Sequence, residues 1–202
     1  MGAITLARED EGATQQAALD EYHVRAAQLN PRAFAPLYET YFKPVYGYCA
    51  RLLRDPQAAA DATSETFVKA LNALPKYRAR SFRSWLFTIA HHVVIDMTRR
   101  RRPTTALDDA GELADYDPPP EEWFLSQESD RRVVQLLRQL SDTQRHVVEL
   151  RMAGLRSQEI ADVLGVRVGA VRTAQYRAHA RLRQLLDDSS SLTGLERFHD
   201  DV

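Results

Sequence analysis

The sequence contains few of the residues that support disulfide frameworks, multi-cysteine metal sites or membrane spans. Cys49 is the single cysteine in 202 residues, which excludes an intramolecular disulfide and any zinc site built from several cysteines. No apolar run reaches the length of about 18 residues needed to span a bilayer. The amino-terminal stretch MGAITLAREDEGATQQ lacks the basic start and apolar core of a signal peptide. These absences predict a cytoplasmic protein, because a reducing compartment needs no disulfides.

Motifs that commonly carry catalysis are also missing. The six histidines form no HExxH pair, and the chain contains neither a GxGxxG turn nor a phosphate-loop lysine motif. His91, His92 and Asp96 are metal-ligating residue types, but consecutive histidines on a helix point about 100° apart and no further ligand completes the set. We therefore predict that the protein is not an enzyme and that it needs no cofactor and no metal.

The chain is rich instead in charge that alternates in sign along its length, although the formal net charge is only −1. Residues 31–102 carry thirteen bases and five acids, and residues 131–186 carry eleven bases and four acids. Residues 103–130, between these blocks, carry nine acids and no base. Such blocks can form an ordinary surface of mixed charge. Two basic blocks also suit a polyanionic partner, but only if the chain carries motifs for binding one.

Helical periodicity dominates the chain, and no segment alternates with the period of a strand. Asn30-Pro31 and Asp55-Pro56 each place an N-cap residue before a proline at the first helical position, whereas Pro44 should kink or divide its helix. We predict an all-α fold of two small helical domains joined by a flexible linker. The predicted organisation is a partly helical N-terminal extension (1–29), a first domain (30–102), an acidic proline-rich linker (103–121), a second domain (122–187) and an acidic tail (188–202).

The second domain contains a helix-turn-helix pattern. Two helices, predicted at 157–164 and 168–186, are separated by a turn that contains Gly165, and in this motif the second helix enters the DNA major groove. Ser157 is predicted to cap the first helix, with Glu159 in its first turn. The outward face of the second helix carries side chains that suit base edges and phosphates: Arg172, Thr173, Gln175, Tyr176, Arg177 and Arg181. This pattern predicts DNA binding.

The first domain combines arginines with aromatic residues in the stretch KYRARSFRSWLFTIAHH. Aromatic rings beside a basic surface can stack on unpaired bases, and the loop residues Arg78, Arg80 and Ser81 are therefore predicted to hold a melted base. Trp85, which follows Phe82 at helical spacing, is instead predicted to pack in the core. The four consecutive arginines that end this helix exceed what the helix dipole needs, so they are predicted to contact phosphates.

Six ordered motifs give the chain its resemblance to a known family. They are AFAPLYETYFKPVYGY, DATSETFVKAL, SFRSWLFTIAHHVVIDMTRRRRP, LSDTQRHVVELR, SQEIADVLGVRVGAVR and RAHARLR. Together they resemble extracytoplasmic-function (ECF, group IV) sigma factors, the promoter-recognition subunits of bacterial RNA polymerase, over about residues 30–102 and 122–186. The resemblance implies a sigma domain 2 followed by a helix-turn-helix sigma domain 4. It also implies a protein that binds core polymerase, recognises −35 and −10 elements and promotes DNA melting and transcription initiation.

The resemblance assigns roles to particular residues. Binding of the melted −10 strand is implied for Arg78, Arg80, Ser81, Phe82, Arg83, His91, His92, Asp96, Arg99, Arg100, Arg101 and Arg102. The −35 reader is implied for residues 168–183, with Arg167 as a phosphate ligand where the family commonly has a capping serine. Docking on the β′ clamp helices of the polymerase is implied for Asp61, Glu65 and Phe67. Docking on the β flap, or plain core packing, is implied for Leu140, Val147 and Leu150.

Two further implications concern partners. Many members of the family are held by an anti-sigma factor, so a protein of that kind is a candidate partner beside core polymerase and promoter DNA. In the family the linker threads the polymerase cleft, where its carboxylates can mimic nucleic acid.

The alternative function is an ordinary helix-turn-helix activator or repressor. Such a protein would bind duplex DNA alone, whereas a sigma factor needs core polymerase and opens the duplex.

Overall fold

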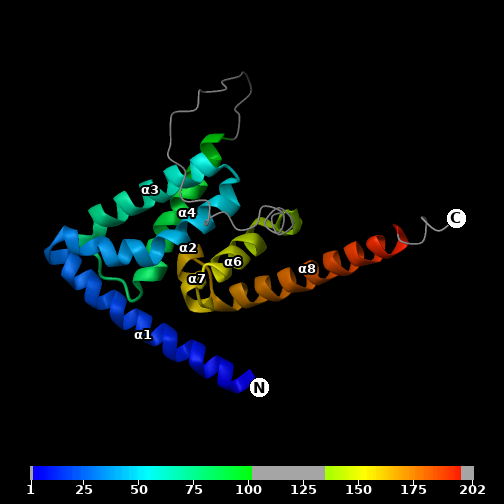
Figure 1. The fold of residues 1–202 in the computed structure, drawn as a ribbon, viewed down its shortest axis with the longest axis horizontal. Coiled ribbons are helices and arrows are strands. Elements are labelled where there is room, and N and C mark those ends of the chain that lie inside the picture. The colour runs from blue at the N-terminus through cyan, green and yellow to red at the C-terminus, as the bar shows by residue number, and fades with distance from the viewer. Residues whose placement is uncertain (1, 102–134, 197–202) are drawn as a thin grey trace.

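The computed structural model of the chain describes residues 2–101 and 135–196 (Figure 1). Every regular element in these two ranges is helical, which confirms the all-α prediction. The predicted linker, residues 103–121, lies outside the described ranges, as do Arg102 and residues 197–202. None of the described helices is long and apolar enough to cross a membrane.

The first described range begins with a long helix and continues with alternating α-helices and short 3₁₀ turns. Its elements are α1 (Gly2–Leu29), η1 (Pro31–Phe34), α2 (Ala35–Leu53), α3 (Pro56–Ala73), η2 (Leu74–Lys76) and α4 (Phe82–Arg101). The two predicted proline-linked caps are present. Oδ1 of Asn30 accepts a hydrogen bond from the backbone N–H of Arg32 at 3.1 Å, and Oδ1 of Asp55 accepts one from that of Ala58 at 3.0 Å.

Pro44 lies inside α2 and does not divide it, so that alternative of the sequence-based prediction is wrong. A proline removes one backbone hydrogen bond from a helix interior. The buried residues Tyr41, Val45 and Tyr48 hold α2 in the core, where it packs against α3 and α4. This tertiary packing offsets the local loss, because most helical stability in proteins comes from the packing of an apolar face.

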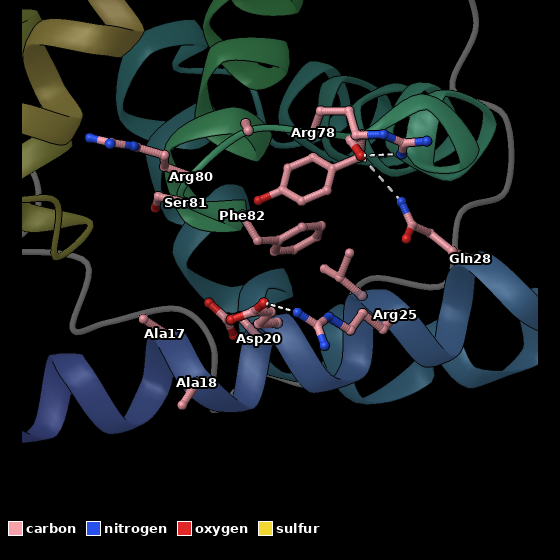
Figure 2. A pocket seen from close by; sticks show the side chains of 13 residues that line it. Ala17, Ala18, Asp20, Arg25, Gln28, Arg78, Arg80, Ser81 and Phe82 are labelled. Carbon is pink, nitrogen blue, oxygen red and sulfur yellow. Dashed lines mark hydrogen bonds and ion pairs between the residues drawn. The ribbon is translucent and has the colours of Figure 1, made fainter.

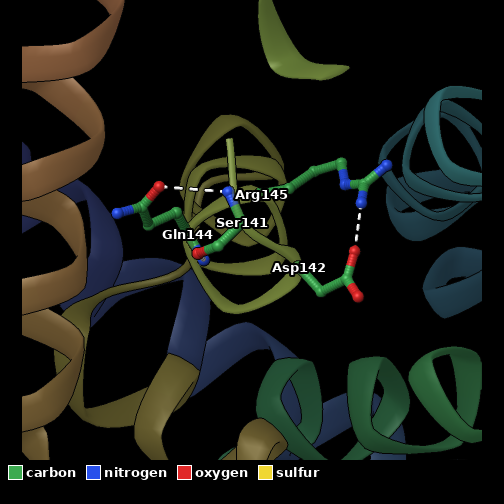
Figure 3. Close-up of polar contacts among 4 residues, drawn as sticks. All are labelled: Ser141, Asp142, Gln144 and Arg145. Atoms are coloured by element: carbon green, nitrogen blue, oxygen red, sulfur yellow. Dashed lines mark hydrogen bonds and ion pairs between the residues drawn. The ribbon is translucent and has the colours of Figure 1, made fainter. Parts of the chain in front are cut away.

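The second described range contains a short helical turn at 135–138 followed by three helices, α6 (Asp142–Met152), α7 (Ser157–Leu164) and α8 (Val168–Glu196). A capping box opens α6 (Figure 3): the side chain of Gln144 accepts from the backbone N–H of Ser141 at 3.1 Å, and Ser141 Oγ accepts from that of Gln144 at 3.4 Å. Asp142 and Arg145 form an ion pair on the same turn. These local bonds satisfy amide groups that the start of a helix leaves unpaired.

The start of α7 differs from the sequence-based prediction, because Ser157 does not cap it. Arg156 occupies the N-cap position, and its backbone N–H donates to Oε2 of Glu159 at 2.9 Å. The hydroxyl oxygen of Ser157 accepts instead from the guanidinium of Arg151 at 2.7 Å. At the other end of α7, Gly165 adopts a left-handed conformation (φ of 65°) that favours glycine and turns the chain into α8.

Buried side chains from both described ranges form one continuous core. The fully buried members include Leu86 and Phe87 of α4 together with Leu150 of α6 and Ile160 of α7. Full burial of a side chain of this size stabilises a protein by about 1.5–3 kcal/mol. Helix α7 packs against α4 and α6 packs against α2, while α8 extends away from this body (Figure 1). The sequence predicted two domains but gave no indication that they pack on one another.

Candidate nucleic-acid interface

The loop at 77–81 and the start of α4 carry the residues that were predicted to bind melted DNA. Arg78 and Arg80 are exposed to solvent. Phe82 is only 3% exposed, and its ring packs against the rings of Tyr41 and Tyr77 at centroid distances of 5.5 and 6.1 Å. The structure thus uses Phe82 to anchor α4 in the core and leaves the arginines of the loop accessible. Trp85, predicted to be a core residue, is half-buried, with its ring 4.9 Å from that of Tyr77.

A cavity of about 660 Å³ separates this loop from α1. Figure 2 shows Arg78, Arg80 and Ser81 on one side of the cavity and the α1 residues Asp20 and Gln28 on the other. The side-chain amide of Gln28 donates to the backbone carbonyls of Leu74 at 3.0 Å and Tyr77 at 3.3 Å, and so joins α1 to the base of the loop. Helix α1 is therefore part of the wall of this candidate site, a role that the sequence did not reveal.

A buried polar chain fixes α1 to the start of α4. The hydroxyl of Tyr41 donates a hydrogen bond to the carboxylate of Asp20. The pKa of Tyr41 is raised, mostly by burial and to a smaller extent by this hydrogen bond. Burial alone would lower the pKa of Arg83, but its hydrogen bond with Tyr41 and the nearby carboxylates raise it. The guanidinium of Arg83 is therefore held in its charged form beside the loop.

The rest of the predicted −10 set divides between two faces of α4. His92, Asp96, Arg99 and Arg100 are exposed, Arg101 is the last residue of the helix, and Arg102 lies outside the described residues. His91 points inward: its Nδ1 lies 2.8 Å from the hydroxyl of Tyr48, and its ring lies 5.0 Å from that of His146 in α6. Burial, with the nearby His146 and His92, lowers the pKa of His91 to about 4. His91 is thus a neutral packing residue at neutral pH in this arrangement.

Helices α7 and α8, joined by the turn at Gly165, form the predicted helix-turn-helix. Buried Val171 and Ala178 face inward from α8. The outward residues that were predicted to read the −35 element are exposed, Tyr176 to 77%; they are Arg167, Arg172, Thr173, Tyr176 and Arg177. Gln175 and Arg181 are half-buried, with Arg181 donating to the side-chain oxygen of Gln184 at 3.0 Å. Most of the predicted set therefore shares one accessible face.

Arg151, at the end of α6, holds the helix-turn-helix in place through hydrogen bonds. The sequence analysis did not single out this residue. Its guanidinium donates to the backbone carbonyl of Leu155 at 2.8 Å, to Ser157 Oγ at 2.7 Å and to the side-chain oxygen of Gln175 at 3.1 Å. These bonds connect the end of α6 and the start of α7 with α8. Arg151 ends the motif LSDTQRHVVELR, but the motif does not reveal its role, because its partners come together only in the folded chain.

The residues that were predicted to contact the polymerase occupy different environments. On α3, Asp61 is exposed and Glu65 forms an ion pair with Lys69 at 2.6 Å, but Phe67 is buried among aromatic rings. The accessible apolar side chains of this helix are Val68 and Leu71. The three candidates for β-flap docking are all buried, as plain core packing requires; they are Leu140, Val147 and Leu150.

The two predicted DNA-reading regions contact one another directly. Ser81 Oγ donates to Oε1 of Glu159 in α7 at 2.8 Å, and Arg83 donates to the backbone carbonyl of Gly154 at 2.9 Å. Ser84 Oγ donates to the backbone carbonyl of Glu159 at 3.4 Å. Arg51 of α2 forms an ion pair with the buried Glu149 of α6. Among the described residues, no cluster of three or more histidine, cysteine or acidic side chains could hold a metal ion.

A helical unit followed by a helix-turn-helix is the arrangement of a sigma factor, and comparison with known families agrees. Residues 37–104 match the family model described as Sigma-70 region 2, and residues 130–182 match that described as Sigma-70, region 4. The chain is 39% identical to the ECF RNA polymerase sigma factor ShbA of Streptomyces griseus, over 69% of this chain and 80% of that protein. The chain belongs to the ECF family of RNA polymerase sigma factors.

Two further similarities extend over most of the chain. The ECF RNA polymerase sigma factor BldN of Streptomyces coelicolor is 35% identical over 82% of this chain, and the match covers 65% of the length of BldN. The solved structure of CnrH, in complex with the cytosolic domain of CnrY, has a TM-score of 0.67 and 28% identity. That match covers 84% of this chain and 97% of CnrH.

Proposed function

We propose that this sigma factor binds core RNA polymerase, reads the −35 element with α8, and captures the −10 element with the loop at 77–81 and the exposed edge of α4. The observation that carries the proposal is the solvent-facing row of α8, in which Arg172, Tyr176 and Arg177 are accessible on a helix-turn-helix. Arginine suits guanine edges and phosphates, and the spacing of these residues suits a helix lying in the major groove.

The proposed capture of the −10 strand by the loop at 77–81 and α4 rests on different chemistry. The exposed Arg78 and Arg80 flank a cavity beside a loop, where a guanidinium can neutralise phosphate and stack on an unpaired base. Arg99 and Arg100 are exposed near the end of α4 and extend the basic surface that a single DNA strand would follow. Such a surface suits single-stranded DNA better than a duplex, because the loop can surround one displaced base.

Core polymerase is proposed to dock on α3, through Asp61 and Glu65 at the solvent face, with Val68 and Leu71 beside them and Phe67 supporting the helix from within. We extend the proposal to a regulatory partner protein, for which an anti-sigma factor is the candidate that the family suggests; the similar protein CnrH is solved in complex with a second protein, the cytosolic domain of CnrY. The chemistry of RNA synthesis then belongs to the polymerase, in the cytoplasm, and this chain contributes recognition and strand capture.

The decisive experiment is run-off transcription of fragmented genomic DNA by purified core polymerase, with and without this protein, followed by mapping of transcript 5′ ends. The proposal expects new start sites that depend on the protein and share two upstream elements. An absence of protein-dependent starts, together with tight binding of the protein alone to duplex DNA, would identify an ordinary helix-turn-helix regulator instead.

A further inference from the structure

Helix α1 lies outside the residues that match the family model for region 2, which begin at residue 37. One face of its C-terminal half nevertheless packs on the rest of the chain, and Asp20, Val24 and Ala27 on this face are each 4% exposed or less. Residues four and three apart lie on the same side of a helix, so the three side chains form one stripe. Gln28 follows this stripe and lines the cavity beside the loop at 77–81.

The side-chain amide of Gln28 holds both ends of the turn η2, which precedes the loop. Its Nε2 donates to the backbone carbonyl of Leu74 at 3.0 Å and to that of Tyr77 at 3.3 Å. A side-chain amide carries two N–H donors, so both are used here. The carbonyl of Leu74 also accepts from the backbone N–H of Tyr77 at 3.0 Å, which closes the turn. A single side chain of α1 therefore fixes the point at which the loop begins.

Arg78 bonds to one of the same two carbonyls. Its Nη1 donates to the backbone oxygen of Tyr77 at 2.7 Å and to that of Pro75 at 3.4 Å. Figure 2 shows the amide of Gln28 and the guanidinium of Arg78 directed at the same backbone oxygen. The other edge of the guanidinium, formed by Nε and Nη2, has no protein partner among the described residues. An arginine edge of this kind can donate two parallel hydrogen bonds to a phosphate.

A second attachment keeps α1 in this position. The buried carboxylate of Asp20 accepts hydrogen bonds from the hydroxyl of Tyr41 in α2 and from Nε2 of Gln16, the latter at 2.8 Å. A buried carboxylate that lost such donors would carry a large desolvation cost, so these bonds favour one placement of the helix. The ring of Tyr41 packs in turn against that of Phe82 at the start of α4. The amide of Gln28 is thus supported from the core.

We infer that Gln28 is a positioning residue for capture of the −10 strand. It fixes the carbonyl of Tyr77, and this carbonyl holds Arg78 with its Nε and Nη2 edge available to the strand. The inference rests on the proposed function for the role of Arg78. It requires Gln28 to act on DNA through Arg78, whereas a residue that only stabilised the fold would act independently of Arg78.

The test is a double-mutant cycle on the rate of promoter opening by the complex of core polymerase with this factor, using Gln28→Leu, Arg78→Ala and the double variant. The template is a duplex promoter mapped by the run-off experiment, and the permanganate reactivity of unpaired thymines reports opening. Gln15→Leu is the matched control, because it makes the same change at an exposed position of the same helix that does not line the cavity.

We expect Arg78→Ala to slow opening about tenfold, and Gln28→Leu to slow it about three- to tenfold, which is the effect of one or two hydrogen bonds. The double variant should be no slower than Arg78→Ala alone, and Gln15→Leu should open promoters at the wild-type rate. Defects that multiply in the double variant, or a wild-type rate for Gln28→Leu, would overturn the inference.

Hydrogen exchange measures the positioning without any promoter. Gln28 is half-buried near the end of α1, so its replacement leaves the core intact. The amides of residues 77–81 should exchange several-fold faster in the free Gln28→Leu protein than in the wild type or in Gln15→Leu. Unchanged exchange contradicts the inference.

The two proposals fail in different ways. A wild-type opening rate for Arg78→Ala would overturn the proposed role of Arg78, and the inference with it. A slowed Arg78→Ala protein beside an unaffected Gln28→Leu protein would overturn the inference alone and leave the proposed function in place.

Discussion

The guanidinium of Arg151 lies 3.1 Å from the side-chain oxygen of Gln175, and this bond connects the end of α6 to the face of α8 that is proposed to read DNA. A second bond from the same group holds Ser157 at the start of α7. The orientation of the reading helix therefore depends on a residue that lies outside it. Arg151 is a positioning residue, and its effects on stability and on recognition can be separated.

Arg151→Ala is expected to lower the free energy of unfolding by about 1–3 kcal/mol, because a partly buried charged donor and its acceptors lose their bonds. It should also weaken binding of the polymerase complex to a duplex carrying the −35 element. Urea unfolding and fluorescence anisotropy measure the two effects. Arg138→Ala, at an exposed position before α6, is the control that should leave both near the wild-type values. Retained −35 affinity in Arg151→Ala would contradict the positioning role.

Arg172→Ala and Arg177→Ala should each weaken −35 recognition by about 1–3 kcal/mol without loss of core polymerase binding. Both side chains are exposed on α8. Fluorescence anisotropy with a promoter duplex measures −35 recognition, and a pull-down with core polymerase measures core binding. An equal loss of core binding would count against the assignment of α8.

Arg78→Ala and Arg80→Ala should slow the opening of duplex promoters more than the use of promoters with a pre-melted −10 region. The reason is that these residues flank the cavity at the loop and are proposed to hold a displaced base, which a pre-melted template already provides. The loss of one such contact corresponds to about tenfold in opening rate. Equal defects on the two templates would refute a role in melting.

Acid should destabilise the folded chain through His91. Its pKa of about 4 in the folded chain lies below the ordinary value of 6.5, so between these values the unfolded chain binds a proton that the folded chain excludes. The contribution of His91 is fully present above pH 6.5 and is lost as the pH falls towards 4. Burial, together with the nearby Arg145, also lowers the pKa of His146, which acts in the same direction.

His91→Gln should therefore flatten the decrease of the melting temperature between pH 7.5 and pH 5, as measured by thermal denaturation. His179→Gln, at an exposed position on α8, is the matched control and should keep the slope of the wild-type protein. A wild-type slope in His91→Gln would show that other groups carry the acid sensitivity.

Features that depend on neighbouring residues could be predicted from the sequence. The caps at Asn30 and Asp55 and the turn at Gly165 follow from local hydrogen bonding and backbone preference. The exposed row of α8 follows in the same way from helical periodicity. The family resemblance added the order of the two units.

Features that depend on distant residues could not be predicted in this way. Ser157 has the chemistry of a cap, but Arg151 from another helix takes its hydroxyl as an acceptor. Glu149 has the sequence character of a solvated charge, yet it is buried against Arg51, whose position in the chain gives no hint of the pair. Phe82 was assigned to the melted strand by the family resemblance, and the fold places its ring beside those of Tyr41 and Tyr77 in the core. Such contacts are set by tertiary packing, which overrides local pattern.

The burial of Cys49 bears on how oxidative signals can reach this protein. It is the single cysteine of the chain, it lies in the core, and burial raises its pKa to about 12, so almost none of it is thiolate at neutral pH. Oxidants such as peroxide react with thiolates that solvent can reach, and they form sulfenic acids or disulfides there. The folded factor offers no such cysteine. A redox signal carried by thiol chemistry would therefore need a sensor cysteine on a molecule other than this folded chain.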